Sequence, residues 1–138
     1  MMSAKNLIIH ADGASRGNPG PSAIGVVLED EQGRVVARIS KSIGITTNNR
    51  AEYLSLIAGL KEALKLGAES VEIKMDSELV VRQLTGKYRV RNPALKPLFT
   101  EAFQLLIKFQ SSSIQHIPRE RNRAADALCR QALRSAGN

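Results

Sequence analysis

The spacing of apolar residues changes near residue 49 from the period of strands to that of helices, and this change limits the fold more than any other feature. Up to residue 43 the apolar residues form three short runs, at residues 5–11, 23–29 and 35–43, with the length and composition of strands. The connections are short and rich in glycine, with a hairpin turn expected at residues 31–33. We therefore expect three consecutive antiparallel strands.

From residue 49 onward the spacing becomes helical and is interrupted by two further strands. The pattern predicts a helix over residues 49–66, which Gly67 can end, and a fourth strand over residues 71–76. The elements expected next are a short helix over residues 78–84, an amphipathic helix that begins near Pro93 and reaches Phe109, a fifth strand over residues 112–117, and a last helix capped by Asn122. The prediction is one α/β domain over residues 1–138, of order βββαβααβα, with a five-stranded mixed sheet flanked by helices and a short flexible tail over residues 135–138.

The composition narrows the classes of function. A chain of 138 residues that is 43% hydrophobic and 24% charged has the composition of a globular domain rather than a disordered segment. No apolar stretch approaches the roughly 20 residues of a membrane span. No secretory leader is recognisable, and the lone Cys129 can form no internal disulfide, so we expect a cytoplasmic protein without membrane contact. The net charge of +7 favours a polyanionic partner such as nucleic acid.

Four acidic residues occupy special positions in the predicted elements. Asp12 and Asp76 are expected to end strands, and Glu52 and Asp126 are expected in the first turns of helices. Such positions allow side chains from distant parts of a chain to meet in one cleft. Carboxylates suit Mg²⁺, and two such ions about 3.5–4 Å apart can catalyse phosphodiester cleavage. The two histidines and one cysteine are too scattered for a recognisable zinc site.

Each acidic residue also has a local interpretation, and spacing alone does not decide between the two. The local alternatives are an Asx turn at Asp12, a cap of the following helix by Asp76 or Ser77, a capping box of Asn49 with Glu52, and an ion pair of Asp126 with Arg123.

Four motifs, in chain order, resemble the signature segments of the type 1 ribonuclease H family. They are DGASRGNPGP at residues 12–21, TTNNRAE at 46–52, DSELV at 76–80 and PRERNRAAD at 118–126. The resemblance spans nearly the whole chain and extends to the order of the elements. It implies metal-dependent endonucleolytic hydrolysis of the RNA strand of RNA/DNA hybrids, leaving 5′-phosphate and 3′-hydroxyl ends.

The resemblance also implies roles for individual residues. The catalytic, metal-binding residues would be Asp12, Glu52, Asp76 and Asp126, holding two Mg²⁺ ions with Mn²⁺ as a substitute. The substrate contacts would be Asn18, Thr47, Asn48 and Asn49, with loop structure as the alternative for Asn18 and helix capping for Asn49. We expect a monomer that binds the hybrid largely without regard to base sequence, because amide and hydroxyl groups can test groove shape and 2′-hydroxyls.

The segment before the last acidic residue departs from the family pattern. Many members carry a histidine in a loop there, but residues 117–122 are too few to contain it. His116 falls in the predicted last strand, where we expect a sheet or surface role. We expect Arg119 or Arg121 to supply part of the electrostatic work near the scissile phosphate, and we count both among the substrate-binding residues.

Two other departures lie around the predicted short helix. Glu78 stands where many relatives have a glutamine that contacts substrate, and a carboxylate would repel phosphate, so that contact is not transferred. The basic protrusion of some relatives is absent. The shorter cationic segment at residues 87–91 resembles the compact branch of the family, and it is either a grip on the DNA strand or a solvated loop.

Two other functions fit the same fold. The chain could be a noncatalytic hybrid-binding or adaptor module, although a binder of phosphate gains nothing from four gathered carboxylates. It could also be a nuclease that acts on DNA, which the TNNR segment at residues 47–50 disfavours. Cleavage of double-stranded RNA, known in the compact branch, is left open by the sequence.

Overall fold

The computed structural model describes residues 5–136, which form five strands, four α-helices and a short 3₁₀ turn. In chain order they are β1 (Asn6–Ser15), β2 (Gly20–Glu29), β3 (Val35–Thr46), α1 (Asn48–Lys65), β4 (Ser70–Met75), α2 (Glu78–Leu84), α3 (Lys96–Leu106), β5 (Ser111–His116), the 3₁₀ turn η1 (Arg119–Arg121) and α4 (Arg123–Ala136). The predicted order βββαβααβα is confirmed. None of the described helices is long and apolar enough to span a membrane.

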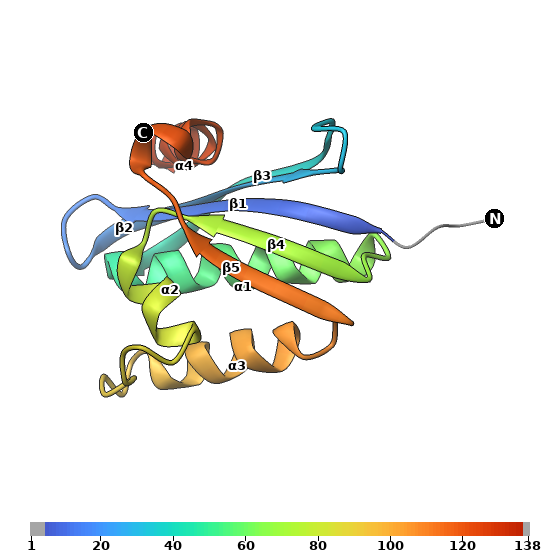
Figure 1. Ribbon diagram of the computed structural model, residues 1–138. Helices are drawn as coiled ribbons and strands as arrows, with labels where there is room; N and C mark the ends of the chain where they lie inside the picture. The colour runs from blue at the N-terminus through green and yellow to red at the C-terminus, as the bar shows by residue number, and fades with distance from the viewer. Residues whose placement is uncertain (1–4, 137–138) are drawn as a thin grey trace.

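The strands form one mixed sheet in the order β3-β2-β1-β4-β5. The first three strands pair antiparallel, as predicted, and β4 and β5 add in parallel to β1. Helices α1, α2 and α3 lie on one face of the sheet, and α4 lies on the other (Figure 1). The main core fills the space between the sheet and α1, with Ile9, Val26, Tyr53 and Ile73 fully or almost fully buried.

Two elements are longer than their composition suggests. The glycine-rich segment after Ala11 reads as a loop, but β1 continues through it to Ser15 and pairs with β2 from Gly25 to Ser22. Only residues 16–19 connect the two strands. At the C-terminus α4 runs to Ala136, so half of the expected tail is helical, and residues 137 and 138 lie outside the described residues.

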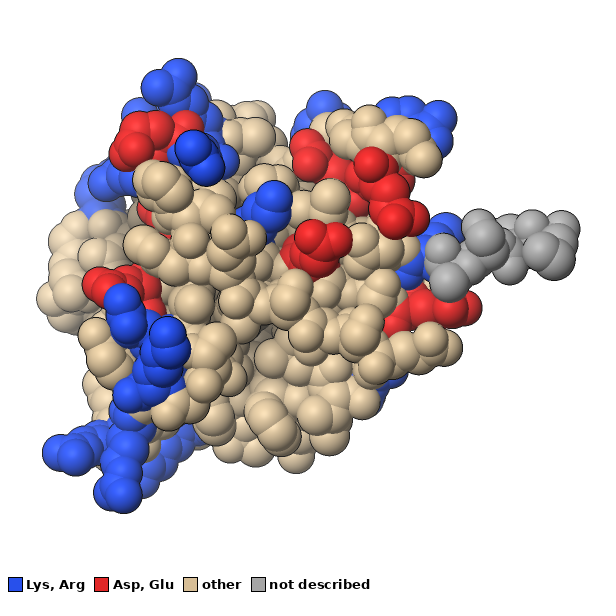
Figure 2. Space-filling model, in the orientation of Figure 1, with Lys and Arg blue, Asp and Glu red and all other residues tan. Residues whose placement is uncertain are grey.

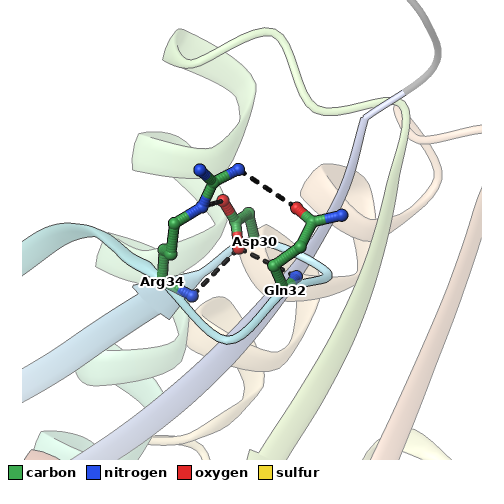
Figure 3. A network of polar contacts seen from close by, with 3 residues as sticks. All are labelled: Asp30, Gln32 and Arg34. Atoms are coloured by element: carbon green, nitrogen blue, oxygen red, sulfur yellow. Dashed lines mark hydrogen bonds and ion pairs between the residues drawn. The ribbon is translucent and has the colours of Figure 1, made fainter.

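The hairpin between β2 and β3 turns where the sequence predicts. One carboxylate oxygen of Asp30 accepts hydrogen bonds from the backbone N–H groups of Gln32 and Arg34, and the other accepts from Arg34 Nε (Figure 3). Gly33 takes a positive φ of 80°, which favours glycine. Local contacts of a single half-buried carboxylate therefore stabilise the turn between β2 and β3.

Two glycines allow the helices on opposite faces to approach the sheet at one place. A Cβ atom at Gly13 would lie 2.2 Å from the carbonyl oxygen of Ala51 in α1, and a Cβ atom at Gly25 would lie 2.1 Å from that of Ala125 in α4. Gly13 follows Asp12, and Gly25 is paired with Asp12 across β1 and β2. The close approaches thus bring the residues that follow Ala51 and Ala125, both acidic, toward Asp12.

The Gly25→Ala variant tests this packing. Its new methyl group would meet the α4 backbone, so we expect the free energy of unfolding in urea to fall by roughly 1–3 kcal/mol. Ser42→Ala, at an exposed position of β3, is the control and should change it by less than about 0.5 kcal/mol. Equal stability of the two variants would contradict the close approach of α4.

Candidate active site

Three acidic side chains from distant parts of the chain surround a fourth, that of Asp12. Asp12 lies inside β1, so its predicted place at a strand end is wrong, but the parallel pairing of β1 with β4 does stop one residue earlier, at Ala11 and Met75. Asp76 directly follows β4, as predicted, and therefore lies at the same edge of the sheet. Glu52 comes from α1 and Asp126 from the first turn of α4. We call Asp12, Glu52, Asp76 and Asp126 the carboxylate cluster.

The electrostatics show that the four carboxyl groups interact. Burial, the charges of Asp76, Asp126 and Glu52, and a hydrogen bond with Asp126 together raise the pKa of Asp12 to about 8, and burial contributes most. Burial also raises the pKa of Glu52 to about 7, with a contribution from Asp76, while a hydrogen bond from the Ser77 side chain opposes the shift. Ionising the whole cluster without a compensating cation is therefore unfavourable.

Asn122 is a residue whose role the sequence reasoning missed. Its Nδ2 donates to the carbonyl oxygen of Ala11 at 3.0 Å and to Asp76 Oδ1 at 2.8 Å. The side chain is 1% exposed, and its Oδ1 is buried without a hydrogen-bond partner. The sequence predicts a helix cap here, and the backbone carbonyl does accept from the Asp126 N–H group. The side chain instead links the ends of the paired parts of β1 and β4 and holds Asp76. No pattern in the neighbouring sequence indicates this long-range contact.

The local interpretations of the acidic residues are only partly correct. Ser77, not Asp76, caps α2 by accepting from the Val80 N–H group. The cap of α1 is Thr47 rather than Asn49, because the helix begins at Asn48, one residue earlier than its apolar spacing suggests. Glu52 is consequently the fifth helical residue, beyond the first turn, and the predicted capping box is wrong.

Asp126 pairs with a different arginine from the one predicted. Its Oδ2 lies 2.7 Å from Arg130 Nη2, one turn along α4, and not beside Arg123. Spacings of three and four residues both bring side chains together on a helix, so the sequence does not distinguish them. Arg130 therefore neutralises one member of the carboxylate cluster from the outside.

The donor set of the cluster suits a hard cation. It consists of carboxylate oxygens. Burial and mutual repulsion together raise the pKa of Asp12, and a divalent cation would relieve the repulsion. Among residues 5–136, however, no three His, Cys, Asp or Glu side chains are arranged as a ready ligand set. Asp76 is held by Asn122 and Asp126 by Arg130, so binding a metal ion requires some of these side chains to turn toward it.

The predicted substrate contacts gather where the β1–β2 loop meets the start of α1. Asn48 Oδ1 accepts from the Ser15 N–H group at 2.8 Å, and the Asn48 N–H group donates to Asn18 Oδ1 at 3.0 Å. Thr47 uses its hydroxyl oxygen to accept from the Arg50 N–H group, so capping engages Thr47 and leaves Asn49 exposed. The two asparagines are therefore held in place partly by each other.

Arg50 joins this region to a segment distant in the sequence. Its Nε donates to Thr46 Oγ1 at 3.0 Å and its Nη1 to the carbonyl oxygen of Ala94 at 2.6 Å. Ala94 lies just after the cationic segment at residues 87–91, which begins as a turn hydrogen-bonded to the carbonyl oxygen of Arg82. Sequence reasoning gave Arg50 no role, because a contact over 44 residues has no local pattern.

The remaining predicted residues lie at the surface around the cluster. Arg119 and Arg121 belong to η1 and are exposed, immediately before Asn122. His116 is the exposed last residue of β5, paired in register with Met75, as predicted for a sheet or surface position. Glu78 pairs with Arg82, with Oε2 2.7 Å from Nε, so its charge is already balanced.

Comparison with known proteins identifies relatives that match almost the whole chain. Residues 10–132 match a family model described as reverse transcriptase-like. The chain is 47% identical over 130 residues to a ribonuclease HI from Halobacterium salinarum, covering 93% of this chain and 65% of that protein. It is 44% identical over 131 residues to the bifunctional protein Rv2228c from Mycobacterium tuberculosis, covering 94% of this chain but only 36% of that one. The chain thus spans less than two thirds of these relatives.

Solved structures show the same similarity in three dimensions. The crystal structure of RNase H1 from Halobacterium salinarum has a TM-score of 0.92 and 45% identity, covering 94% of this chain and 98% of that one. LC11-RNase H1 in complex with an RNA/DNA hybrid has a TM-score of 0.90 and 42% identity, covering 96% and 99%. The α/β fold and its sheet order are therefore those of these enzymes.

The Asp12→Asn variant tests the repulsion within the cluster. In the wild type, Asp12 holds its proton up to a pH of about 8 when folded but only to about 4 when unfolded, so its ionisation lowers stability as the pH rises through this interval. In a chelating buffer we expect the Tm of the variant to exceed that of the wild type at pH 8, with a smaller difference at pH 5. Thermal unfolding followed by circular dichroism measures both.

Asp30→Asn is the matched control. Hydrogen bonds from Arg34 and Gln32 lower the pKa of Asp30, so its charge favours the folded state and the control should show no gain in Tm. If Asp12→Asn also brought no gain at pH 8, the carboxylate cluster would not be under the repulsion described above.

Proposed function

The chain belongs to the type 1 ribonuclease H family, and from this premise we propose that it hydrolyses the RNA strand of RNA/DNA hybrids. The observation that carries the proposal is the gathering of three carboxyl groups around the buried carboxyl group of Asp12. A protein that only bound phosphate would be weakened by such a cluster, whereas a metal-dependent nuclease needs one. The relatives named as ribonucleases H, and the relative solved with a hybrid, support the same choice of substrate.

The carboxylate cluster would hold the divalent cations, Mg²⁺ by preference with Mn²⁺ as a substitute. A pair of such ions, when bound, supplies the activation of the attacking water and the charge stabilisation of the leaving 3′-oxygen, which leaves 5′-phosphate and 3′-hydroxyl ends. The remaining work of the protein is positioning. Asn122 fixes Asp76 through a hydrogen bond of 2.8 Å, and the Ser77 side chain hydrogen-bonds to Glu52.

The substrate would be read mainly by shape. Amide groups and one hydroxyl group lie where the β1–β2 loop meets the start of α1, and they belong to Asn18, Asn48, Asn49 and Thr47. Such groups can hydrogen-bond to the sugar hydroxyls and phosphates of a nucleic acid. Because Asn18 and Asn48 are linked by a hydrogen bond, they would meet the substrate as one unit. Such contacts test for 2′-hydroxyls without selecting a base sequence.

Two cationic segments flank this surface. Residues 87–91 would contact the DNA strand, and the Arg82 guanidinium lies 5.5 Å from the centre of the Tyr88 ring, which holds that ring beside α2. The exposed Arg119 and Arg121 of η1 would contact a phosphate near the scissile bond. Figure 2 shows Lys and Arg side chains gathered on the left of the molecule, over α4 and over the connection from α2 to α3. Double-stranded RNA, which shares the A-form shape, is a second candidate substrate.

The Asp76→Asn variant tests the role of the cluster. We expect cleavage of a strand-labelled hybrid in Mg²⁺ to fall at least 1,000-fold, on the order of the loss of one essential catalytic group. Binding of the hybrid, followed by fluorescence anisotropy, should be retained because the amide still accepts a hydrogen bond from Asn122. Glu31→Gln, an exposed carboxylate in the β2–β3 turn, is the control and should cleave at the wild-type rate. Turnover by Asp76→Asn close to that of the control would remove Asp76 from the mechanism.

The Arg119→Ala and Arg121→Ala variants test the proposed replacement for the missing loop histidine. Loss of a guanidinium beside the scissile phosphate should lower kcat about 10-fold or more and reduce the salt dependence of kcat/KM. The measurement is steady-state cleavage at several salt concentrations. If both variants keep the wild-type rate and salt dependence, these arginines do not act on the substrate.

A further inference from the structure

Helix α4 carries three arginines on one side. Arg123, Arg130 and Arg134 are separated by seven and four residues, and at 100° per residue their directions fall within about 40° of one another. Together with Asp126 and Ala127 they line a groove of about 390 Å³ formed by α4 alone. The groove runs along α4 from Arg123, past Asp126 of the carboxylate cluster, to Arg134.

The charges in this groove are not balanced. Arg130 pairs with Asp126, but among residues 5–136 neither Arg123 nor Arg134 lies within ion-pair distance of a carboxylate. Arg123 and Arg134 are both exposed. Arg130 and Arg134 are also one turn apart, a spacing at which like charges destabilise a helix.

Arg123 is placed where stability alone disfavours it. It is the first residue of α4, and a cation at the N-terminus of a helix opposes the helix dipole. Its charge therefore has no stabilising partner in the described chain and costs some helix stability. An anion bound in the groove would reverse this cost.

A fourth guanidinium contacts the last turns of α4 from the β1–β2 loop, although it does not line the groove. Arg16 Nη2 donates to the carbonyl oxygen of Leu133 at 2.8 Å, in the last turns of α4. The loop that Arg16 begins also carries Asn18, one of the proposed substrate contacts. The loop that carries Asn18 is thus held against the last turns of α4. The Lys and Arg side chains over α4 are visible at the upper left of Figure 2.

We infer that the α4 groove binds phosphodiester groups of a nucleic-acid strand that continues beyond the cleavage site, with Arg123 and Arg134 as binding residues. This inference rests on the proposed function and extends its substrate surface. Guanidinium groups bind phosphate through paired hydrogen bonds, and polyanion binding removes the imbalance of charge. Asp126 and Arg134 are eight positions apart, which corresponds to about 12 Å of helix and matches three to four nucleotide steps at about 3.4 Å each.

The test compares the Arg123→Ala/Arg134→Ala double variant with a Lys65→Ala/Lys108→Ala control. Lys65 ends α1, and Lys108 lies just before β5, so both exposed cations sit at the end of the sheet away from the carboxylate cluster. With a long strand-labelled hybrid we expect the arginine variant to raise KM at least 5-fold while kcat changes less than 2-fold. The slope of log KM against log salt concentration should fall by about 1 to 2, or nearly one per phosphate contact. The control should match the wild type.

Shortened hybrids locate the contact. Trimming the hybrid on one side to fewer than about three nucleotides from the cleaved bond should abolish the difference between wild type and arginine variant, whereas trimming the other side should preserve it. A KM and salt slope equal to those of the control on long hybrids would overturn the inference. So would a defect that persists on hybrids trimmed from either side, because it would place the arginines at the cleavage site itself.

Two further measurements separate this inference from the proposed function. If the wild type cleaves no hybrid, the proposed function fails, and anisotropy of a labelled long hybrid still tests the groove through the same pair of variants. Weaker binding by the arginine variant supports the groove, and binding equal to the control overturns it. The Tm of Arg123→Ala should equal or exceed that of the wild type, since the substitution removes a cation from the N-terminus of α4.

Discussion

The mutual repulsion of four carboxyl groups is the constraint on which the rest of this structure depends. Asp12 is 8% exposed and lies within the influence of Asp76, Asp126 and Glu52, which together with burial raise its pKa to about 8. Folding must therefore supply the free energy that keeps these groups together. The hydrogen bonds of Asn122 and Ser77, and the ion pair from Arg130, each restrain one member of the carboxylate cluster.

The sheet supplies the geometry through close backbone contacts. Gly13 and Gly25 leave room for α1 and α4 to touch β1 and β2 from opposite faces, next to Glu52 and Asp126 respectively. Parallel pairing of β1 with β4 then delivers Asp76 to the same edge. Four residues that are 114 positions apart at their extremes in the chain meet because two strands and two helices converge at this one place.

Much of this arrangement follows from the sequence, and the exceptions have physical reasons. Apolar periodicity predicts every strand and α-helix in order, because burial on one face imposes a period of two or 3.6. It does not predict the 3₁₀ turn η1. It fails at residues 12–15, where small residues that resemble a loop instead make room for helices. The local sequence also does not decide whether Thr47 or Asn49 caps α1. Nor does it decide whether Asp126 pairs with Arg123 or Arg130, because helix spacings of three and four residues both allow an ion pair. Asn122 and Arg50 act over long sequence distances that no local pattern records.

The net charge of +7 is unevenly distributed between the carboxylate cluster and the rest of the chain. Four of the thirteen acidic residues form the carboxylate cluster, so nine remain against twenty Lys and Arg over the rest of the chain. A basic surface that surrounds an acidic centre attracts nucleic acid but repels the scissile phosphate until cations neutralise that centre. A divalent-metal titration with a hybrid labelled on each strand tests this most directly. The account predicts cleavage of the RNA strand alone, only in the presence of Mg²⁺ or Mn²⁺; an RNA strand that stays intact at every metal concentration would contradict it.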